Sequence, residues 1–189
     1  MKKIWTLFFL LIISVSVFAE GISGLFGIEF GTESKDVKVI MKDKGWKLSK
    51  SDDTTLTYTK NKGTYANLAV TDIKFYFFDD KFYEVTISLP AVTKIDDIVS
   101  AVKAIQEAFS LTCVGNEENK LDSYTVLSTF SYIDSELNTF RLNLLTYKSV
   151  SSGWFELINY EIQKEKKQAD DKIKEEENAK KNKIITSDL

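Results

Sequence analysis

Three pairs of adjacent aspartates stand out before the charged segment at 164–189, and their type and spacing could support chemistry. They are Asp52-Asp53, Asp79-Asp80 and Asp96-Asp97. Neighbouring carboxylates can act as a general acid and base, or hold a hard cation. The first two pairs fall in predicted hairpin turns, where aspartate favours the turn, and the third falls in the first turn of a predicted helix, where negative charge suits the dipole. We therefore interpret all three pairs as structural and expect neither a catalytic nor a metal site.

Other reactive side chains are scarce. The chain has no histidine, and Cys113 and Arg141 are its only cysteine and arginine. Histidine-based nucleophile pairs, internal disulfides and cysteine-rich metal sites are thereby excluded. Cys113 lies in an apolar run at 111–114, which is typical of a buried core residue. We expect a protein that is not an enzyme and has no cofactor; a hydrolase built from Ser, Lys or Asp alone is a third possibility, because geometry defines such sites.

Residues 1–19 have the order of a Sec signal peptide. Lys2 and Lys3 precede an apolar stretch at 4–13, and small residues lead to Ala19, after which we expect cleavage. An uncleaved membrane anchor is the alternative, but the apolar run is shorter than the ~20 residues that a span needs. The residues directly after the apolar run include no cysteine, so we expect no lipoprotein signal. The sequence predicts an exported protein, periplasmic or secreted, with no membrane span after cleavage.

The charge of the remaining chain is mildly acidic. Loss of Lys2 and Lys3 lowers the formal net charge of −3, and no basic face is clustered in the sequence. A nucleic-acid-binding protein would show such a face. We therefore expect no nucleic-acid partner.

The first half begins with a predicted short helix. Thr32 or Ser34 is a possible N-cap with Asp36 in the first turn, and Gly45 is placed to end the helix. Strands are predicted at 46–51, 56–60, 65–70 and 73–78. The last of these is expected to form a hairpin with the strand that follows.

Side-chain alternation predicts the register of this hairpin. A three-residue loop at 79–81 would pair Phe78 with Phe82 and place like side chains together on each face. The resulting aromatic core face pairs Phe77 with Tyr83, Phe75 with Val85, and Ile73 with Ile87. Trp46 and Trp154 are also expected in the core.

The second half repeats the plan of the first. Apolar residues recur at helical spacing from Ile95 to Phe109, behind a possible capping box of Thr93 and Asp96. Strands are predicted at 111–114, 124–132, 140–147 and 154–162, with turns at 115–120 and 134–138. The order is helix, four strands, helix and about four strands. This order predicts an α+β fold, with antiparallel sheet meanders and helices on one face.

The domain organisation follows from composition. We expect a single domain at 20–163, with possible halves 20–90 and 91–163, after the signal peptide at 1–19. Residues 164–189 are dominated by charged side chains and predict a helical or disordered tail with ion pairs at i to i+4. A coiled-coil partner helix is the alternative, although the apolar seam is sparse.

One surface feature suggests a binding role. Tyr76 on the outer face of the hairpin, with Phe78 and Phe82 near its loop, could form an exposed aromatic patch for a partner or an apolar ligand. These three residues are the predicted partner-binding patch.

Residues Gly31-Thr32-Glu33-Ser34-Lys35-Asp36-Val37, followed by Ile40-Met41 and Gly45, resemble the helix opening of small bacterial envelope proteins. These include the barrel-assembly accessory lipoproteins and the β-lactamase-inhibitory proteins, and the tandem halves look more like the latter. The lipoprotein cysteine is absent, and Gly45-Trp46-Lys47 replaces the customary Gly-x-Pro. The resemblance implies a protein-binding module without catalysis.

Two functions from different classes are therefore expected. The first is an exported, non-enzymatic envelope protein that binds an unknown protein partner. The second is a carrier of an apolar small molecule, held between the sheet and the helix at 95–109. The sequence leaves the partner, the ligand and the oligomeric state open.

Overall fold

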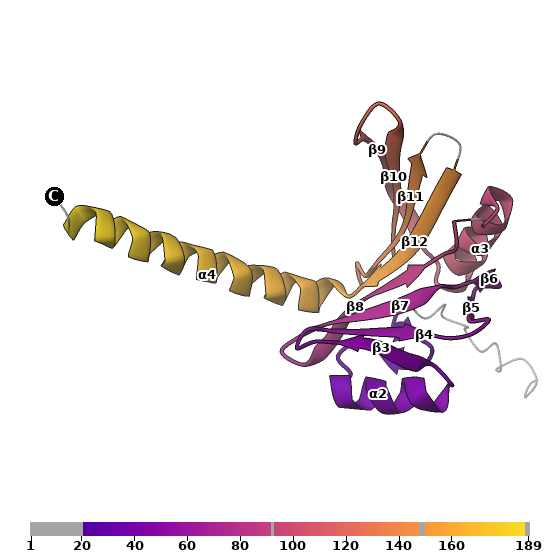
Figure 1. The fold of residues 1–189 in the computed structure, drawn as a ribbon, viewed down its shortest axis with the longest axis horizontal. Helices are drawn as coiled ribbons and strands as arrows, with labels where there is room; N and C mark the ends of the chain where they lie inside the picture. The colour runs from indigo at the N-terminus through magenta and orange to yellow at the C-terminus, as the bar shows by residue number, and fades with distance from the viewer. Residues whose placement is uncertain (1–20, 92, 148–149, 188–189) are drawn as a thin grey trace, which may run out of the picture.

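The computed structural model describes residues 21–91, 93–147 and 150–187 of the chain. The predicted signal peptide therefore lies outside the described residues. Three helices, one large antiparallel sheet and two small hairpins make up the described part (Figure 1). The predicted α+β class is confirmed. Among the described residues, no helix has both the length and the apolar character needed to cross a membrane.

The large sheet has eight strands, and each half of the chain supplies four consecutive positions. In spatial order the strands are β3 (Lys47–Ser51), β4 (Thr55–Thr59), β7 (Asp72–Phe78), β8 (Lys81–Ser88), β12 (Val150–Ile158), β11 (Thr139–Tyr147), β10 (Thr125–Ile133) and β9 (Thr112–Lys120). All neighbouring pairs are antiparallel. The halves meet through their last strands, β8 and β12, so the first strand of each half lies at an outer edge.

Two short hairpins complete the strand inventory. They are β1 (Gly24–Leu25) with β2 (Ile28–Glu29), and β5 (Thr64–Tyr65) with β6 (Leu68–Ala69). The single strand predicted at 65–70 is therefore wrong. Ala66 and Asn67 have φ values of 48° and 65°, which turn the chain back on itself between β5 and β6.

Helix α2 (Ser34–Asp43) forms where predicted, because Val37 and Met41 bury one face completely. Gly45, at a φ of 75°, ends the helix, and its N–H donates to the Lys42 carbonyl at 2.9 Å. The N-terminus differs from the prediction, because neither Thr32 nor Ser34 caps it. Instead, Oδ1 of Asp80, in the β7–β8 turn, accepts from the Ser34 N–H at 3.2 Å.

Helix α3 (Ile95–Ala108) confirms the second predicted helix. The predicted capping box does not form, because Thr93 Oγ1 donates to the Pro90 carbonyl at 2.7 Å. The buried face of α3 carries Ile98, Ala101, Val102 and Ile105. These side chains join those of α2 in one core cluster, so both helices cover the same face of the sheet.

The core of the domain is aromatic, as predicted. Phe75, Phe82, Phe140 and Phe155 are fully buried. The Phe75 and Phe82 ring centroids are 5.1 Å apart, and those of Phe140 and Phe155 are 5.4 Å apart. Aromatic side chains bury large areas, and such pairs add stability beyond that area. The packing thus supplies stability without a disulfide.

Cys113 does not belong to this core, and the expectation that it is buried is wrong. It is exposed on β9. Because β9 is an edge strand and no helix covers it, every residue from Thr112 to Lys120 is exposed. The turn predicted at 115–120 is in fact the continuation of this strand.

The β7–β8 hairpin differs from its predicted register near the turn. Asp79 and Asp80 form a two-residue turn with φ values of 47° and 58°, and Phe78 pairs with Lys81. These positive φ values match the twist of the flanking strands, which favours two-residue turns over three-residue ones. A bulge then adds Tyr83 to β8, and this restores the predicted register. The pairs of Phe75 with Val85 and Ile73 with Ile87 are as predicted.

Helix α4 (Tyr160–Ser187) begins within the stretch predicted as the last strand and continues through the charged tail (Figure 1). The Ile162 N–H donates to Asn159 Oδ1 at 2.9 Å, which caps the helix. Residues up to Asp170 keep a half-buried face, whereas residues 171–180 are exposed. One predicted i to i+4 pair forms, with Lys166 Nζ 2.6 Å from Asp170 Oδ2.

Candidate functional site

The predicted partner-binding patch is divided between the two faces of the sheet. Tyr76 and Phe78 are half-buried, but Phe82 is completely buried, with its ring 5.0 Å from that of Phe30. Phe82 was expected near the surface because a three-residue loop would place it beside Phe78. The two-residue turn instead pairs Phe82 with Phe77 on the core face. Of the predicted patch, Tyr76 and Phe78 stay accessible.

Tyr83 shows the opposite error: it was predicted in the core and lies outside it. The prediction placed it in the core opposite Phe77, but as the bulge residue it lies outside the core cluster and is buried beside the start of α4. Its carbonyl accepts from the Asn159 N–H at 2.8 Å. Burial, with smaller contributions from Glu84, Tyr76 and Asp170, raises the pKa of Tyr83 to about 12. α4 is thereby joined to one end of the sheet face opposite α2 and α3, here called the outer face.

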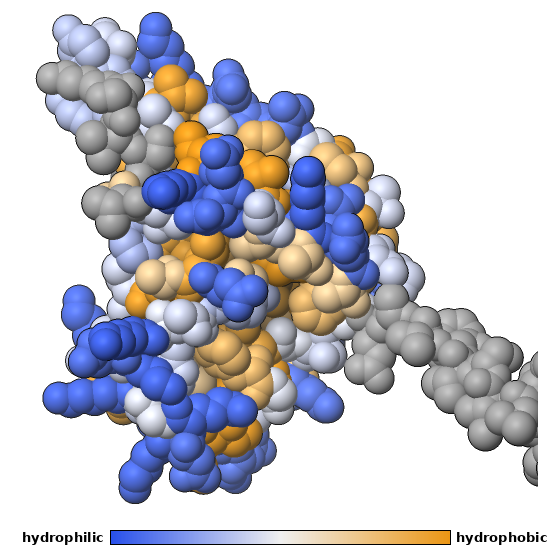
Figure 2. Space-filling view, turned by 90° about the vertical axis from the view of Figure 1, so that its right-hand side faces the viewer, coloured by the Kyte–Doolittle hydropathy of each residue, from blue (hydrophilic) through white to orange (hydrophobic). Residues whose placement is uncertain are grey.

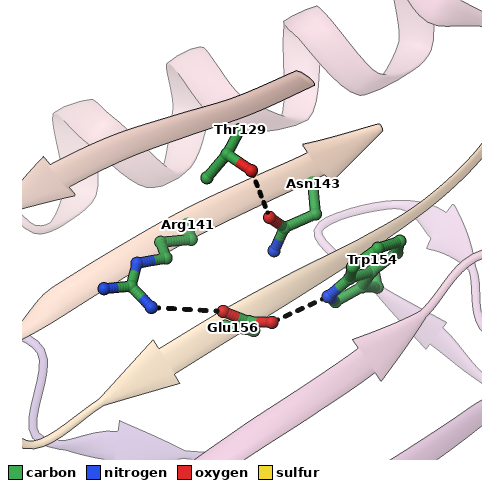
Figure 3. A network of polar contacts seen from close by, with 5 residues as sticks. All are labelled: Thr129, Arg141, Asn143, Trp154 and Glu156. Atoms are coloured by element: carbon green, nitrogen blue, oxygen red, sulfur yellow. Dashed lines mark hydrogen bonds and ion pairs between the residues drawn. The ribbon is translucent and has the colours of Figure 1, made fainter. Parts of the chain in front are cut away.

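Trp154 is also on the outer face, and its predicted place in the core is wrong. It alternates with the buried Phe155 along β12 and is half-buried. Its Nε1 donates to Glu156 Oε1 at 2.8 Å, and Oε2 of the same carboxylate lies 3.7 Å from an Arg141 guanidinium nitrogen (Figure 3). These contacts connect the indole and the carboxylate, both on β12, to Arg141 on the neighbouring strand β11.

Asn143 lies directly opposite Trp154 on β11. The side chain is 5% exposed, and its Oδ1 accepts from Thr129 Oγ1 at 2.8 Å (Figure 3). Its Nδ2 has no hydrogen-bond partner among the described residues. A buried donor without an acceptor costs free energy, and native proteins contain few of them.

A shallow groove of about 370 Å³ crosses the middle of this face. Tyr76, Glu84, Thr86, Ser88, Trp154 and Glu156 are among its lining residues. It therefore spans β7, β8 and β12, across the line where the two halves meet. Lys74 Nζ lies 4.6 Å from the centre of the Tyr76 ring and supplies a cation at the same edge.

Glu84 is the residue of the groove whose carboxyl has a raised pKa. Burial raises the pKa of its carboxyl, and the nearby charge of Glu156 raises it further. Arg141, Lys166 and Lys74 act in the opposite direction and lower the pKa. The groove thus offers ring faces, carboxylates and nearby cations for recognition, which suits binding.

The aspartate pairs occupy the structural positions that were expected. Asp52 accepts from the N–H of Thr54 at 2.9 Å and the hydroxyl of Thr55 at 2.5 Å in its own turn. These hydrogen bonds, led by that of Thr55, lower the pKa of Asp52 to about 2. Asp96 and Asp97 lie in the first turn of α3. Within the described residues, the His, Cys, Asp and Glu side chains form no group of three or more that could hold a metal ion.

The place proposed for an apolar cargo is occupied by side chains. The apolar face of α3 packs into the core, and a solvent-open groove of about 430 Å³ lies between α3 and the β5–β6 hairpin. Small residues and charged residues share its lining, among them Ala69, Ala101, Lys94 and Asp97. Figure 2 shows this side of the molecule, with hydrophobic areas interrupted by hydrophilic ones.

Sequence reasoning missed the residues that organise the outer face. Arg141 and Asn143 alternate with buried Phe140 and Leu142, which is the signal that could have placed them opposite the core. Their partners are on β12, and Glu156 and Trp154 become their neighbours only through strand register.

Comparison of the chain with protein-family models, with curated proteins and with solved structures found no match.

Proposed function

We propose that this is an exported, non-enzymatic bacterial envelope protein that binds another protein through the outer face of its sheet. The observation that carries the proposal is the groove of about 370 Å³ on this face, which the partly accessible Tyr76 and Trp154 line and which crosses the line where the two halves meet. A partner that covers these two rings would bury apolar area that is accessible to water in the unbound protein.

The residue types of the outer face support the same proposal. Tyr76, Trp154 and Arg141 belong to the three types that most often dominate binding energy at protein interfaces. All three are partly accessible, and hydrogen bonds or ion pairs already fix two of them. Fixed side chains lose little conformational entropy on binding.

The proposed export follows from the predicted signal peptide at 1–19. The protein would reach the periplasm, or the medium, after cleavage following Ala19. Determination of the mature N-terminus in cell fractions tests this part. A chain that starts at Met1 in the membrane fraction would contradict export by cleavage.

Capture from an envelope extract, with matched variants, tests the binding face. Trp154→Ser removes the indole, and Arg141→Glu reverses a partly exposed charge at the other side of Glu156. Val39→Ser is the matched control, because Val39 is a 59% exposed apolar residue on α2, away from the outer face. Melting curves identify any variant that fails to fold.

We expect the unmodified protein and Val39→Ser to capture the same partner, and both outer-face variants to lose it. Cross-links from residues placed beside Trp154 should map to that partner. Capture that is unchanged by both outer-face variants would refute the proposal, as would repeated failure to recover a specific partner.

A further inference from the structure

Another recess lies on the helix-covered face of the sheet, between α2 and the edge strand β3. Its volume is about 510 Å³. The lining consists of Lys38, Lys42, Gly45, Trp46, Lys47, Leu48 and Tyr58. Three lysines thus surround a floor of two aromatic residues and a leucine.

The recess exists because the sheet ends there. β3 is an edge strand, so no further strand covers the apolar side chains beneath α2. Leu48 pairs with Tyr58 across the sheet and remains 41% exposed, whereas Trp46 is 6% exposed. Exposed apolar area that lies against a buried aromatic floor is typical of ligand sites.

Tyr58 adds an unsatisfied donor to this floor. The residue is 1% exposed, and its hydroxyl finds no hydrogen-bond partner in the part of the chain that the structure describes. Its ring packs edge-on against Phe75, with centroids 5.9 Å apart, which holds it in place. Burial raises the pKa of Tyr58 to about 12, so the phenol keeps its proton at neutral pH.

The charged residues that line the recess are all lysines. The amines of Lys38, Lys42 and Lys47 form no ion pair within the described ranges, and all three residues are exposed. Lys60 is different, because its Nζ already donates to the Lys44 carbonyl at 2.8 Å. Figure 2 shows hydrophilic side chains around a smaller hydrophobic area toward the end of the molecule where Figure 1 places α2 and β3.

We propose that the recess between α2 and β3 binds an amphiphilic anion, a molecule with an apolar body and one carboxylate or phosphate group. The body would cover Trp46 and Leu48 above Tyr58, and the anionic group would lie among the three lysines. Charge complementarity selects this ligand over a neutral or cationic amphiphile. The proposal is independent of the outer face, because the recess lies on the helix-covered side of the sheet.

Calorimetric titration of the protein, purified as the cell processes it, tests the proposal. The probes are decanoate, decyl phosphate and decyltrimethylammonium, each below its micelle concentration. We expect both anions to bind and the cation to bind at least roughly tenfold more weakly. Stronger binding of decanoate would identify carboxylates as the natural class, and stronger binding of decyl phosphate would identify phosphates.

Matched variants locate the site. Lys38→Gln combined with Lys42→Gln should weaken anion binding by roughly tenfold, since two charges are lost. Lys103→Gln combined with Lys120→Gln removes two exposed lysines elsewhere and should leave binding unchanged. Leu48→Glu places a carboxylate at the recess and should abolish binding of the anions.

Two results would overturn the proposal. One is equal affinity for decanoate and decyltrimethylammonium, which would indicate apolar adsorption without charge selection. The other is unchanged anion binding in both the Lys38/Lys42 and the Leu48 variants, which would place any bound probe elsewhere. Because Lys38, Lys42 and Leu48 are all accessible, folding of these variants is expected, and melting curves verify it.

Discussion

The backbone N–H of Ile22 donates a 2.7 Å hydrogen bond to Oδ2 of Asp134, a residue 112 positions further along the chain. Ile22 is also held by Asn138, whose Nδ2 donates to the Ile22 carbonyl at 3.1 Å. Asn138 Oδ1 also accepts from Asn159 Nδ2 at 3.0 Å and from the Tyr160 N–H at 3.2 Å. One buried polar cluster thus joins the start of the described chain, the β10–β11 turn and the start of α4.

Replacement of Asn138 should therefore destabilise the whole domain. Asn138→Ala would leave the buried Ile22 carbonyl and the partly buried Tyr160 N–H without these partners. Unsatisfied buried groups cost about 1–3 kcal/mol each, so we expect the free energy of unfolding to fall by about 2–4 kcal/mol. Glu136→Ala, which changes an exposed side chain of the same turn, is the control, and guanidinium denaturation is the measurement. Equal stability of the two variants would contradict the assigned role.

The β7–β8 turn allows a test of backbone conformation. Asp79 has a φ of 47°, and glycine adopts this region without steric cost, so Asp79→Gly should raise the free energy of unfolding by about 0.5 kcal/mol. Asp80→Ala should lower it by about 1 kcal/mol, because the acceptor for the Ser34 N–H is lost. Asp80→Asn keeps a side-chain oxygen as that acceptor, so its free energy of unfolding should lie between those of Asp79→Gly and Asp80→Ala. Thermal melts of the three variants test this order.

Asp52 provides a test by pH. Hydrogen bonds to the folded chain lower its pKa from 3.8 to about 2, so its contribution to stability is complete above pH 3.8 and disappears as the pH falls through 2. Asp52→Asn cannot titrate, and its stability should vary less with pH in this window. Denaturation of both proteins between pH 2 and pH 5 measures the difference. Parallel curves would contradict the lowered pKa.

The elements that the sequence could predict are those set by local periodicity. The apolar spacing of α3 and the alternation around Phe75 and Val85 depend on one helix face and one strand face, and both are confirmed. The two-half α+β plan follows from the same patterns. The helix spacing and the strand alternation are each visible within a window of about 15 residues.

The predictions are wrong at positions whose burial depends on pairing between strands that are distant in the sequence. Phe82 is buried because a bulge shifts one strand by a residue, and Cys113 is exposed because β9 has no neighbour on one side. The position of Trp154 beside Asn143 and Glu156 depends on the register of β11 and β12. The alternation within one strand indicates which side chains share a face, but it does not indicate which strand lies beside it or where a bulge falls.

The charged helix α4 should divide into a docked part and a free part. A chain that ends at Asp171 keeps the half-buried face of α4 and should melt at the same temperature as the full chain. A chain that ends at Asn159 loses the Tyr160 N–H to Asn138 and uncovers Tyr83, so we expect a loss of about 1–3 kcal/mol. If the chain that ends at Asp171 melts at a lower temperature than the full chain, residues beyond Asp171 contact the domain.

Glu84 connects stability with the proposed binding face. Because burial raises the pKa of its carboxyl above 4.5, folding is most favoured when the group is protonated. The resulting stability is complete below pH 4.5 and is lost as the pH rises through the folded-state pKa. Glu84→Gln should therefore increase stability at pH 7 and flatten this part of the pH profile, which denaturation from pH 4 to pH 8 can measure.

Glu84→Gln should also weaken partner capture if the Glu84 carboxylate takes part in recognition. A buried charge that lowers stability is expected where a surface must recognise a partner, since function and stability often conflict at such positions. Thr86→Ala, a change on the same strand and face that removes no charge, is the control. Glu84→Gln protein that is more stable and still captures the partner would show that Glu84 does not take part in recognition. Protein that is less stable at pH 7 would contradict the raised pKa itself.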